Sequence, residues 1–121
     1  MMDLFQLGYF RLHSGDDSRF KIECDALTDG SLRCIAYLLS LRLPPFGSVE
    51  GVPLGGLRLA EKLKPYRTQG PLLIVDDVVT TGGSMERHRA GREAIGAAIF
   101  GRGKVPDWVT PLFPMTPELV V

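Results

Sequence analysis

The residues with the clearest chemical potential form one run, 72–84, which reads LLIVDDVVTTGGS. Its four leading apolar residues predict a buried strand, Asp76 and Asp77 follow at the strand's carboxyl end, and hydroxyl and glycine residues then lead into a helix. Ligands of open α/β sheets bind outside the carboxyl ends of the strands. Backbone N–H groups at a glycine-rich turn favour a phosphate, and neighbouring carboxylates accept hydrogen bonds from sugar hydroxyls. The run therefore predicts a site for a phosphorylated sugar.

This run resembles the phosphoribosyl-pyrophosphate (PRPP) motif of the type I phosphoribosyltransferases at all thirteen positions. The resemblance implies that Asp76 and Asp77 are the catalytic residues, that they bind the ribose 2- and 3-hydroxyls, and that Asp77 helps to stabilise positive charge on the sugar. The 5-phosphate would be held through backbone N–H groups and hydroxyls at Thr80, Thr81, Gly82, Gly83 and Ser84. Mg²⁺ would accompany PRPP, bound mainly by the substrate and water, because no dedicated ligand cluster is visible in the sequence.

Two other interpretations of the run explain less. The stretch LLIVDD also resembles the opening of response-regulator receiver domains, in which an acidic pair near the N-terminus binds magnesium. Here 71 residues precede the strand, and the next predicted strand ends in Gly101 rather than in an aspartate. If Asp76 and Asp77 merely capped a turn, the hydroxyl and glycine residues of 80–84 would have no explanation.

A second glycine-rich segment lies about 20 residues before the acidic pair. Three glycines in six residues, followed by a helix start, provide an anion site. In phosphoribosyltransferases a loop at this place binds pyrophosphate through its backbone, and orotate-type members carry a similar GVPLGG-like segment. The resemblance assigns this role to Gly51, Val52, Pro53, Leu54, Gly55 and Gly56. Arg58 either adds positive charge toward the pyrophosphate or is a solvated arginine of the following helix.

Two segments indicate where the acceptor of the ribose would bind. Residues 10–27 resemble the N-terminal hood of orotate phosphoribosyltransferases, with His13 where a lysine is common. Residues 104–109 resemble the hypoxanthine-type segment in which an aromatic ring stacks on the base. The candidate residues for contacts with the acceptor are thus His13, Lys104, Trp108 and Val109. Alternatively, His13 is an exposed histidine of a turn, and Trp108 is an aromatic residue of the core or of the sheet edge. The two resemblances point to different bases, so the sequence does not decide whether the acceptor is a purine, a pyrimidine or another compound.

The elements that must position these residues alternate between strand and helix. This order predicts right-handed βαβ units in a mainly parallel sheet of about four or five strands with helices on both faces. The resemblance implies an α/β, Rossmann-like fold: a hood at 1–27, a core at 28–100 and a C-terminal loop and edge segment at 101–121. Predicted strands are 10–12, 20–23, 48–50, 72–75 (central), 97–100 and 109–113. Predicted helices are one capped by Thr28 and ended by Pro44, one at 57–63 and one at 85–95.

One family segment is missing. Ordinary type I members insert a flexible loop before the PRPP strand, and it closes over the site, whereas here only residues 67–71 precede Leu72. Excluding water matters when an electrophilic sugar centre forms. We therefore keep three interpretations: a compact transferase completed by a partner, by default in a homodimer; a non-catalytic PRPP- or nucleotide-binding regulatory module; and a phosphosugar hydrolase or phosphorylase.

Composition narrows the class of protein. The chain has 121 residues, enough for a single domain, and its 14 basic and 14 acidic residues give no sign of a nucleic-acid or membrane-surface partner. No apolar run approaches a membrane span of roughly 18 residues, and the N-terminus lacks a secretory signal. We expect a cytoplasmic protein in which Cys24 and Cys34 are buried and reduced.

Overall fold

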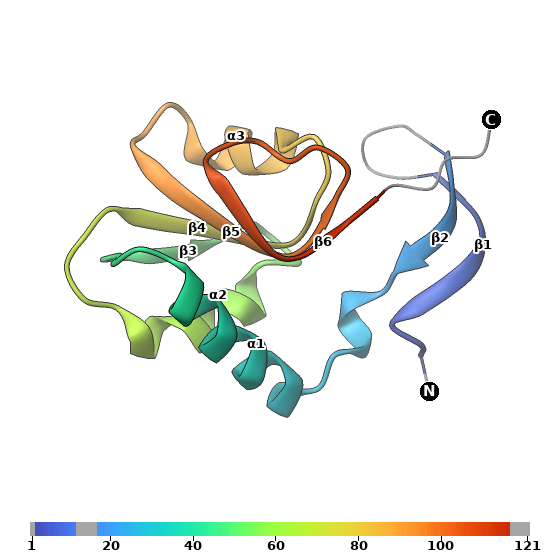
Figure 1. Ribbon diagram of the computed structural model, residues 1–121, viewed down its shortest axis with the longest axis horizontal. Coiled ribbons are helices and arrows are strands. Elements are labelled where there is room, and N and C mark those ends of the chain that lie inside the picture. Colours follow the sequence, from blue (N-terminus) through green and yellow to red (C-terminus); the bar gives the residue numbers. More distant parts are fainter. Residues whose placement is uncertain (1, 12–16, 117–121) are drawn as a thin grey trace.

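The structure is a computed structural model that describes residues 2–11 and 17–116 (Figure 1). An antiparallel hairpin consists of β1 (Phe5–Arg11) and β2 (Asp17–Ile22). A parallel sheet contains, in spatial order, β3 (Val49–Gly51), β4 (Leu72–Val79), β5 (Ala94–Arg102) and β6 (Val109–Met115). The helices are α1 (Asp29–Arg42), α2 (Leu57–Leu63) and α3 (Gly83–Arg89), with 3₁₀ turns η1 (Cys24–Ala26) and η2 (Lys64–Tyr66).

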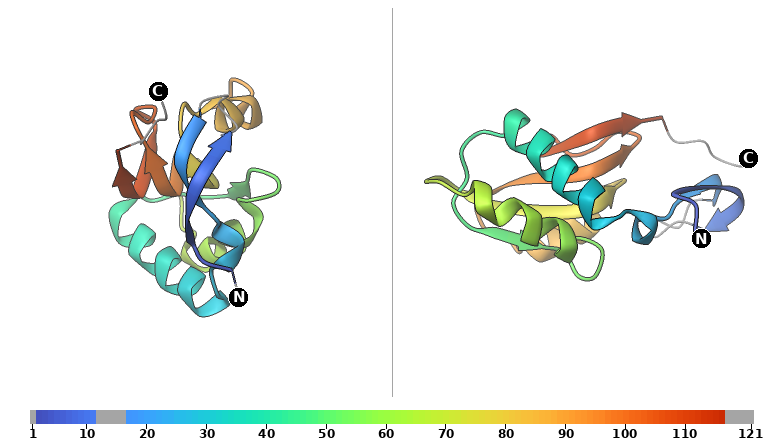
Figure 2. Two further views of the ribbon diagram at one scale, coloured as in Figure 1. Left: turned by 90° about the vertical axis from the view of Figure 1, so that its right-hand side faces the viewer. Right: turned by 90° about the horizontal axis from the view of Figure 1, so that it is seen from below.

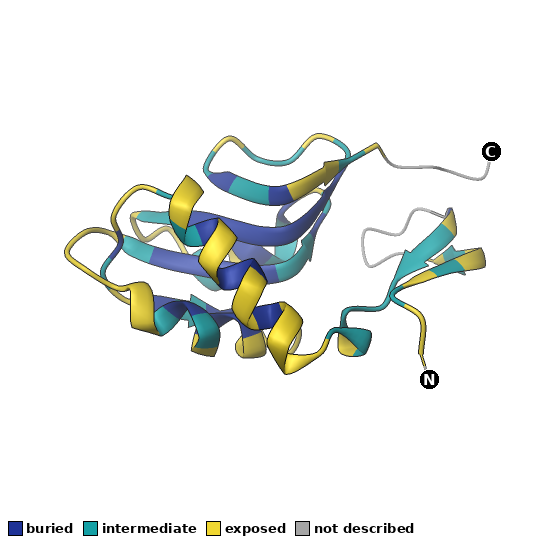
Figure 3. Cartoon of the chain, turned by 60° about the horizontal axis from the view of Figure 1, so that its bottom comes forward, coloured by how far each residue is buried: buried dark blue, intermediate teal, exposed yellow. Residues whose placement is uncertain are grey.

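The predicted layering is confirmed. Strand β4 lies inside the sheet beside β3, with Val49 opposite Leu73. Helices α1 and α2 cover one face, where their apolar side chains pack on Leu73 and Val75, while Met85 of α3 packs on the other face against Ile74 (Figures 1 and 2). The sheet is largely buried, whereas the hairpin stands to one side with mostly exposed or half-buried residues (Figure 3).

Helix α1 begins and ends as its sequence predicts. The Thr28 hydroxyl accepts a hydrogen bond from the Ser31 backbone N–H at 3.0 Å, and extended backbone at Leu43, before Pro44, ends the helix. The expectation of two buried cysteines is wrong for Cys34, which is exposed, because it stands two positions from the buried Leu32 and thus on the other side of the helix. Cys24 is half-buried, and both thiols are free.

The predicted helix at 85–95 is shorter than expected. It ends at Arg89, because Ala90 and Gly91 adopt left-handed backbone with φ of 53° and 77° and turn the chain. Ala94 and Ile95 therefore begin β5 instead of ending the helix. At their carboxyl ends, β4 and β5 also run beyond the predicted 75 and 100, to Val79 and Arg102.

The connection from β5 to β6 is unusually short for a parallel pair. Because Gly96 pairs with Val109, the chain must return about 20 Å along the sheet, from Arg102, in residues 103–108. The seven Cα–Cα steps from Arg102 to Val109 span at most about 25 Å when fully extended, so no helix fits in this return. It runs over the α3 face, where Trp108 packs into the core around Met85.

Candidate functional site

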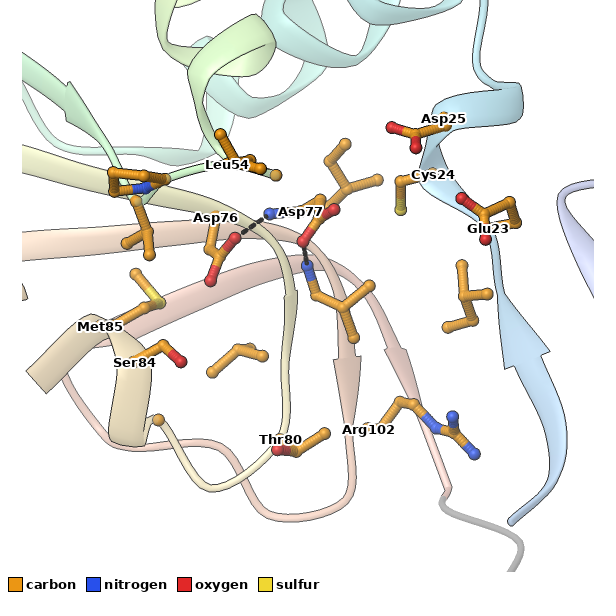
Figure 4. A pocket seen from close by; sticks show the side chains of 18 of the residues that line it. Glu23, Cys24, Asp25, Leu54, Asp76, Asp77, Thr80, Ser84, Met85 and Arg102 are labelled. Atoms are coloured by element: carbon orange, nitrogen blue, oxygen red, sulfur yellow. Dashed lines mark hydrogen bonds between the residues drawn. The ribbon is translucent and has the colours of Figure 1, made fainter. Parts of the chain in front are cut away.

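A cleft of about 1030 Å³ separates the hairpin from the carboxyl ends of β4 and β5 (Figure 4). It is the place where the rule for open α/β sheets puts a ligand. The two predicted phosphate-binding segments and the acidic pair meet there. The predicted residues that line it are Val52, Pro53, Leu54, Gly55, Arg58, Asp76, Asp77, Thr80, Thr81, Gly82, Gly83 and Ser84.

The acidic pair is part of strand β4 rather than of the turn that follows it. The Asp77 backbone N–H donates to the Asp76 carboxylate at 2.8 Å, and the Val78 N–H donates to the Asp77 carboxylate at 2.7 Å. Neighbouring strand residues face opposite sides of a sheet. The Asp76 carboxylate accordingly lies toward Ser84, and the Asp77 carboxylate toward Cys24 (Figure 4).

The two carboxyls differ in environment. Asp76 is 8% exposed. Burial, and next the negative charge of Asp77, raise the pKa of Asp76 from 3.8 to about 7. Asp76 thus releases its proton less readily than an exposed aspartic acid does. Across the cleft, burial of the Cys24 thiol, and next the charge of Asp77, raise the pKa of that thiol to about 12.

The loop at residues 51–56, which we call the pyrophosphate-type loop, folds directly beside the acidic pair. The Val52 N–H donates to the Val75 carbonyl at 2.9 Å, and the Gly56 N–H donates to the Val52 carbonyl at 2.8 Å. Gly51 and Gly56 do not line the cleft. A Cβ on Gly51 would lie 2.4 Å from the Gly56 carbonyl oxygen, so these glycines close the loop on itself. The Pro53–Leu54 peptide bond within the loop is cis.

Gly55 is the contact between this loop and the acidic pair. A Cβ at this position would lie 2.4 Å from Oδ2 of Asp77 and 2.7 Å from its Oδ1. The Asp77 carboxylate therefore rests on the Gly55 backbone in space that any side chain would fill. Arg58, one helical turn further on, donates from Nη2 to the Leu27 carbonyl at 2.9 Å and so joins α2 to the segment that follows the hairpin.

The turn at residues 80–84, which we call the phosphate-type turn, needs glycine at one position for two reasons. Gly82 has a φ of 87°, and a Cβ there would lie 2.4 Å from Cγ of Pro106 in the β5–β6 connection. The sequence did not single out Arg87, which also lines the cleft and donates from Nη2 to the Ser84 hydroxyl at 3.2 Å.

Arg102 is a second cleft residue that was not predicted. It ends β5, is 4% exposed, stacks on the Phe20 ring at 3.7 Å, and donates to the Phe20 carbonyl and the Ser18 hydroxyl. Burial lowers its pKa, and its Nε atom is buried without a hydrogen-bond partner in the described part of the chain. The rule that strand ends carry ligand residues would have identified it if β5 had been predicted to its full length.

The structure does not bring the predicted acceptor residues to the cleft. His13 lies outside the described residues. Trp108 packs against Gly96, in the amino half of β5, and lies under the Arg89 guanidinium at 4.1 Å, while Val109 is buried and Lys104 is exposed outside the cleft. Trp108 does not line the cleft, because the short connection returns the chain to the amino half of β5.

Residues 67–71, which stand where type I phosphoribosyltransferases insert a flexible loop, lie at the amino end of β4, the end away from the cleft. The Thr68 N–H donates to the Phe46 carbonyl and the Gly47 N–H to the Pro71 carbonyl. A Cβ on Gly70 would lie 2.4 Å from the Pro45 carbonyl oxygen, so two backbones are in direct contact here. Within the described residues, nothing between α2 and β4 lines the cleft.

Comparisons with known proteins agree with this geometry. Neither a protein-family model nor a curated protein sequence matches the chain. Among solved structures, the orotate phosphoribosyltransferase of Aeropyrum pernix aligns with a TM-score of 0.69 and 25% identity, over 83% of this chain and 76% of that one. Leishmania donovani UMP synthase gives 0.67 and 21%, over 82% of this chain and 29% of that one. The Mycobacterium tuberculosis orotate phosphoribosyltransferase gives 0.65 and 17%, over 91% and 89%. The chain thus has the type I phosphoribosyltransferase fold and is structurally similar to orotate phosphoribosyltransferases across most of its length, at low sequence identity.

Proposed function

We propose that the protein is a PRPP-dependent phosphoribosyltransferase that transfers ribose 5-phosphate to a nitrogenous acceptor and releases pyrophosphate. The observation that carries the proposal is the meeting of three parts in one cleft: the acidic pair, the turn at 80–84 and the glycine-rich loop before α2. The contact of Gly55 with Asp77 fixes the loop beside the pair. The type I fold supports this assignment.

The proposed binding mode follows the chemistry of each part. The 5-phosphate would lie at residues 80–84, among the backbone N–H groups, Thr80, Thr81 and Ser84. The ribose hydroxyls would face Asp76 and Asp77, and the pyrophosphate would lie along Val52–Gly55 with Arg58 at its border. Carboxylates repel phosphate, so Asp76 and Asp77 would contact the sugar and not the anions.

In the proposed transfer, an acceptor nitrogen attacks C1 of the ribose. The new C1–N bond forms as the C1–O bond to pyrophosphate breaks, the pyrophosphate takes the bonding electron pair, and a nitrogen-bound proton leaves to the solvent or to pyrophosphate. Positive charge develops on the sugar ring during this step. Asp77 would stabilise that charge, because an oriented carboxylate in a cleft acts on charge where it forms.

Magnesium fits this site as an ion that enters with PRPP. Asp76 and Asp77 offer carboxylate oxygens, the donor type that Mg²⁺ prefers, and Mg²⁺ commonly keeps several waters and substrate phosphate oxygens. Within residues 2–11 and 17–116, no three His, Cys, Asp or Glu side chains are grouped to hold a metal by themselves. When bound, the ion would neutralise charge on the leaving pyrophosphate.

We propose that the acceptor enters on the hairpin side of the cleft, because the other sides are taken by the two phosphate-binding segments. Ile22 and Leu27 provide apolar surface there, and Arg102 provides charge. Trp108 has no part in this arrangement.

The alternative of a non-catalytic module that binds PRPP or a nucleotide has one specific observation in its favour. No described segment between α2 and β4 reaches the cleft to exclude water. The same uncovered cleft would suit a phosphosugar hydrolase or phosphorylase, because water or phosphate could enter it as the acceptor.

The test measures PRPP binding by calorimetry and pyrophosphate release with magnesium across a panel of purine and pyrimidine bases. We expect PRPP binding, and pyrophosphate release that requires one of the bases. The double variant Asp76→Asn/Asp77→Asn should fold and bind magnesium–PRPP more weakly. Unchanged PRPP affinity in this variant contradicts the assignment of the site. PRPP binding with no turnover favours the regulatory module, and base-independent release of pyrophosphate or phosphate favours a hydrolase.

A further inference from the structure

Three of the four basic side chains of helix α3 and of the turn after it are paired with carboxylates. His88 and Arg92 both contact the Glu50 carboxylate, at 2.9 and 3.0 Å, and Arg89 pairs with Glu86. Arg87 makes no ion pair with any carboxylate in the described part of the chain. A cation without a carboxylate partner, on a helix where its neighbours have one, is available to an external anion.

The Arg87 guanidinium lies over the phosphate-type turn. Its Nη1 is 3.3 Å from the position that a Cβ on Gly83 would take, and Thr81 Oγ1 is 3.8 Å from the same position. Its Nη2 donates to the Ser84 hydroxyl at 3.2 Å, and all four residues line the cleft. An anion seated on this turn would therefore lie within reach of the guanidinium.

The hydrogen bond to Ser84 also orients the serine. Because the Ser84 oxygen accepts from Arg87, its own O–H is left to donate elsewhere. A phosphate oxygen at the turn would then receive the serine hydroxyl and a guanidinium N–H together. Guanidinium binds phosphate through charge-assisted, often bidentate hydrogen bonds, which are stronger than those between neutral groups.

We propose that Arg87 is a ligand of the ribose 5-phosphate and determines the preference of this site for a phosphorylated over an unphosphorylated sugar. The inference rests on the proposed function and adds to it a charged side chain from α3 that no part of the sequence motif contains. The remaining ligands of the turn would be backbone groups and hydroxyls, which carry no net charge, so Arg87 would supply the charge that distinguishes phosphate from hydroxyl.

The test compares Arg87→Gln and Arg87→Lys with the wild type, and uses Arg33→Gln as the matched control. Arg33 is an exposed arginine of α1 outside the cleft, so its change removes the same charge elsewhere. Calorimetry measures the affinities for ribose 5-phosphate, for magnesium–PRPP and for magnesium–pyrophosphate alone. Thermal unfolding checks that each variant folds.

We expect Arg87→Gln to bind ribose 5-phosphate and PRPP at least tenfold more weakly and pyrophosphate unchanged, with Arg87→Lys in between and Arg33→Gln like the wild type. Affinity of Arg87→Gln for PRPP within twofold of the wild type overturns the inference and leaves the proposed function standing. An equal loss of affinity for pyrophosphate and for ribose 5-phosphate overturns it too, because the charge of Arg87 would then attract any anion in the cleft rather than bind the 5-phosphate. If the wild type binds neither PRPP nor ribose 5-phosphate, both proposals fail.

Discussion

At the scale of single residues, the site depends on two neighbouring carboxyls that their surroundings make unequal. Asp76 is buried on the side of the phosphate-type turn, and Asp77 lies on the Gly55 backbone on the side of the pyrophosphate-type loop (Figure 4). Like charges at adjacent positions do not ionise independently, and the more buried one keeps its proton longer. Burial therefore raises the pKa of Asp76, the more enclosed member of the pair.

The raised pKa of Asp76 predicts a pH dependence of stability. Between about pH 4 and pH 7 the unfolded chain has released a proton that the folded protein keeps, so the free energy of unfolding falls as pH rises through this window. Asp76→Asn stays neutral and lacks this fall. We expect urea unfolding at pH 8 to show the variant more stable than the wild type by about 4 kcal/mol, a difference that shrinks toward pH 4. Equal slopes for the two proteins over this window would contradict the buried state of Asp76.

Gly55→Ala tests the contact between the loop and the acidic pair. The new methyl group would overlap the Asp77 carboxylate, which would have to leave its position on the loop. We expect PRPP affinity to fall about tenfold, or about 1.4 kcal/mol, while unfolding changes by about 1 kcal/mol or less. Gly30→Ala is the control, because a Cβ there meets no atom closer than 3.9 Å. Equal PRPP binding by Gly55→Ala and Gly30→Ala would show that Asp77 does not need this space.

At the scale of elements, the short β5–β6 connection decides what its side chains do. Its extended path lays Val105 near Gly101, Pro106 on Gly82 and Trp108 near Gly96. The connection therefore supports the phosphate-type turn from behind and completes the core on the α3 face.

Trp108→Ala should accordingly be a stability variant. Trp108 is half-buried, so we expect a loss of about 2–3 kcal/mol, below the range for fully buried tryptophans. Denaturant unfolding measures this loss, and calorimetry at a temperature where the variant is folded should give unchanged affinity for PRPP and for any acceptor found. Selective loss of acceptor affinity with normal stability would restore the stacking role predicted from the sequence.

In the described part of the chain, the hairpin contacts the sheet through Arg102 with Phe20 and Ser18, through Phe5 against Phe100 at 5.7 Å, and through Ile22, which packs on the core. A two-stranded hairpin is marginal without such support. We expect Arg102→Met to speed hydrogen exchange of the β1 and β2 amides by tenfold or more while β4 amides keep their protection. If β1, β2 and β4 all exchange faster to the same extent, Arg102 supports the whole fold rather than the hairpin.

At the scale of the whole molecule, the cleft is open and the chain offers no described segment to cover it. None of the helices in the described part has the length and apolar character needed to span a bilayer. We propose that a second copy of the chain completes the site, because the described segments leave the cleft open.

Sedimentation at micromolar concentration should then give a mass near twice the 13.3 kDa of one chain. Turnover per chain should fall on dilution through the dissociation range, because a separated chain would leave the sugar open to water. A monomer whose turnover per chain does not change with concentration would contradict completion by a partner.

The local pattern of the sequence was enough to predict the acidic pair, the phosphate-type turn and most of the arrangement of helices on the sheet. The residues of 72–84 are contiguous, and a strand that ends in carboxylates and turns through glycine is specified by local pattern, as is the Thr28-capped helix before Pro44. These features appear in the structure because their geometry depends on bonds and contacts within a few residues.

Only the tertiary structure decided what the distant side chains do. Trp108 belongs to the core because six residues must return along β5, and the raised pKa of Asp76 depends on what buries it. Arg102 reaches the cleft because β5 extends to meet the hairpin. Arg87 reaches it because the side chain, one helical turn after Gly83, lies back over the turn at 80–84. Each outcome depends on the path of the chain through space, since burial and the pairing of charges are set by neighbours that lie far apart in sequence.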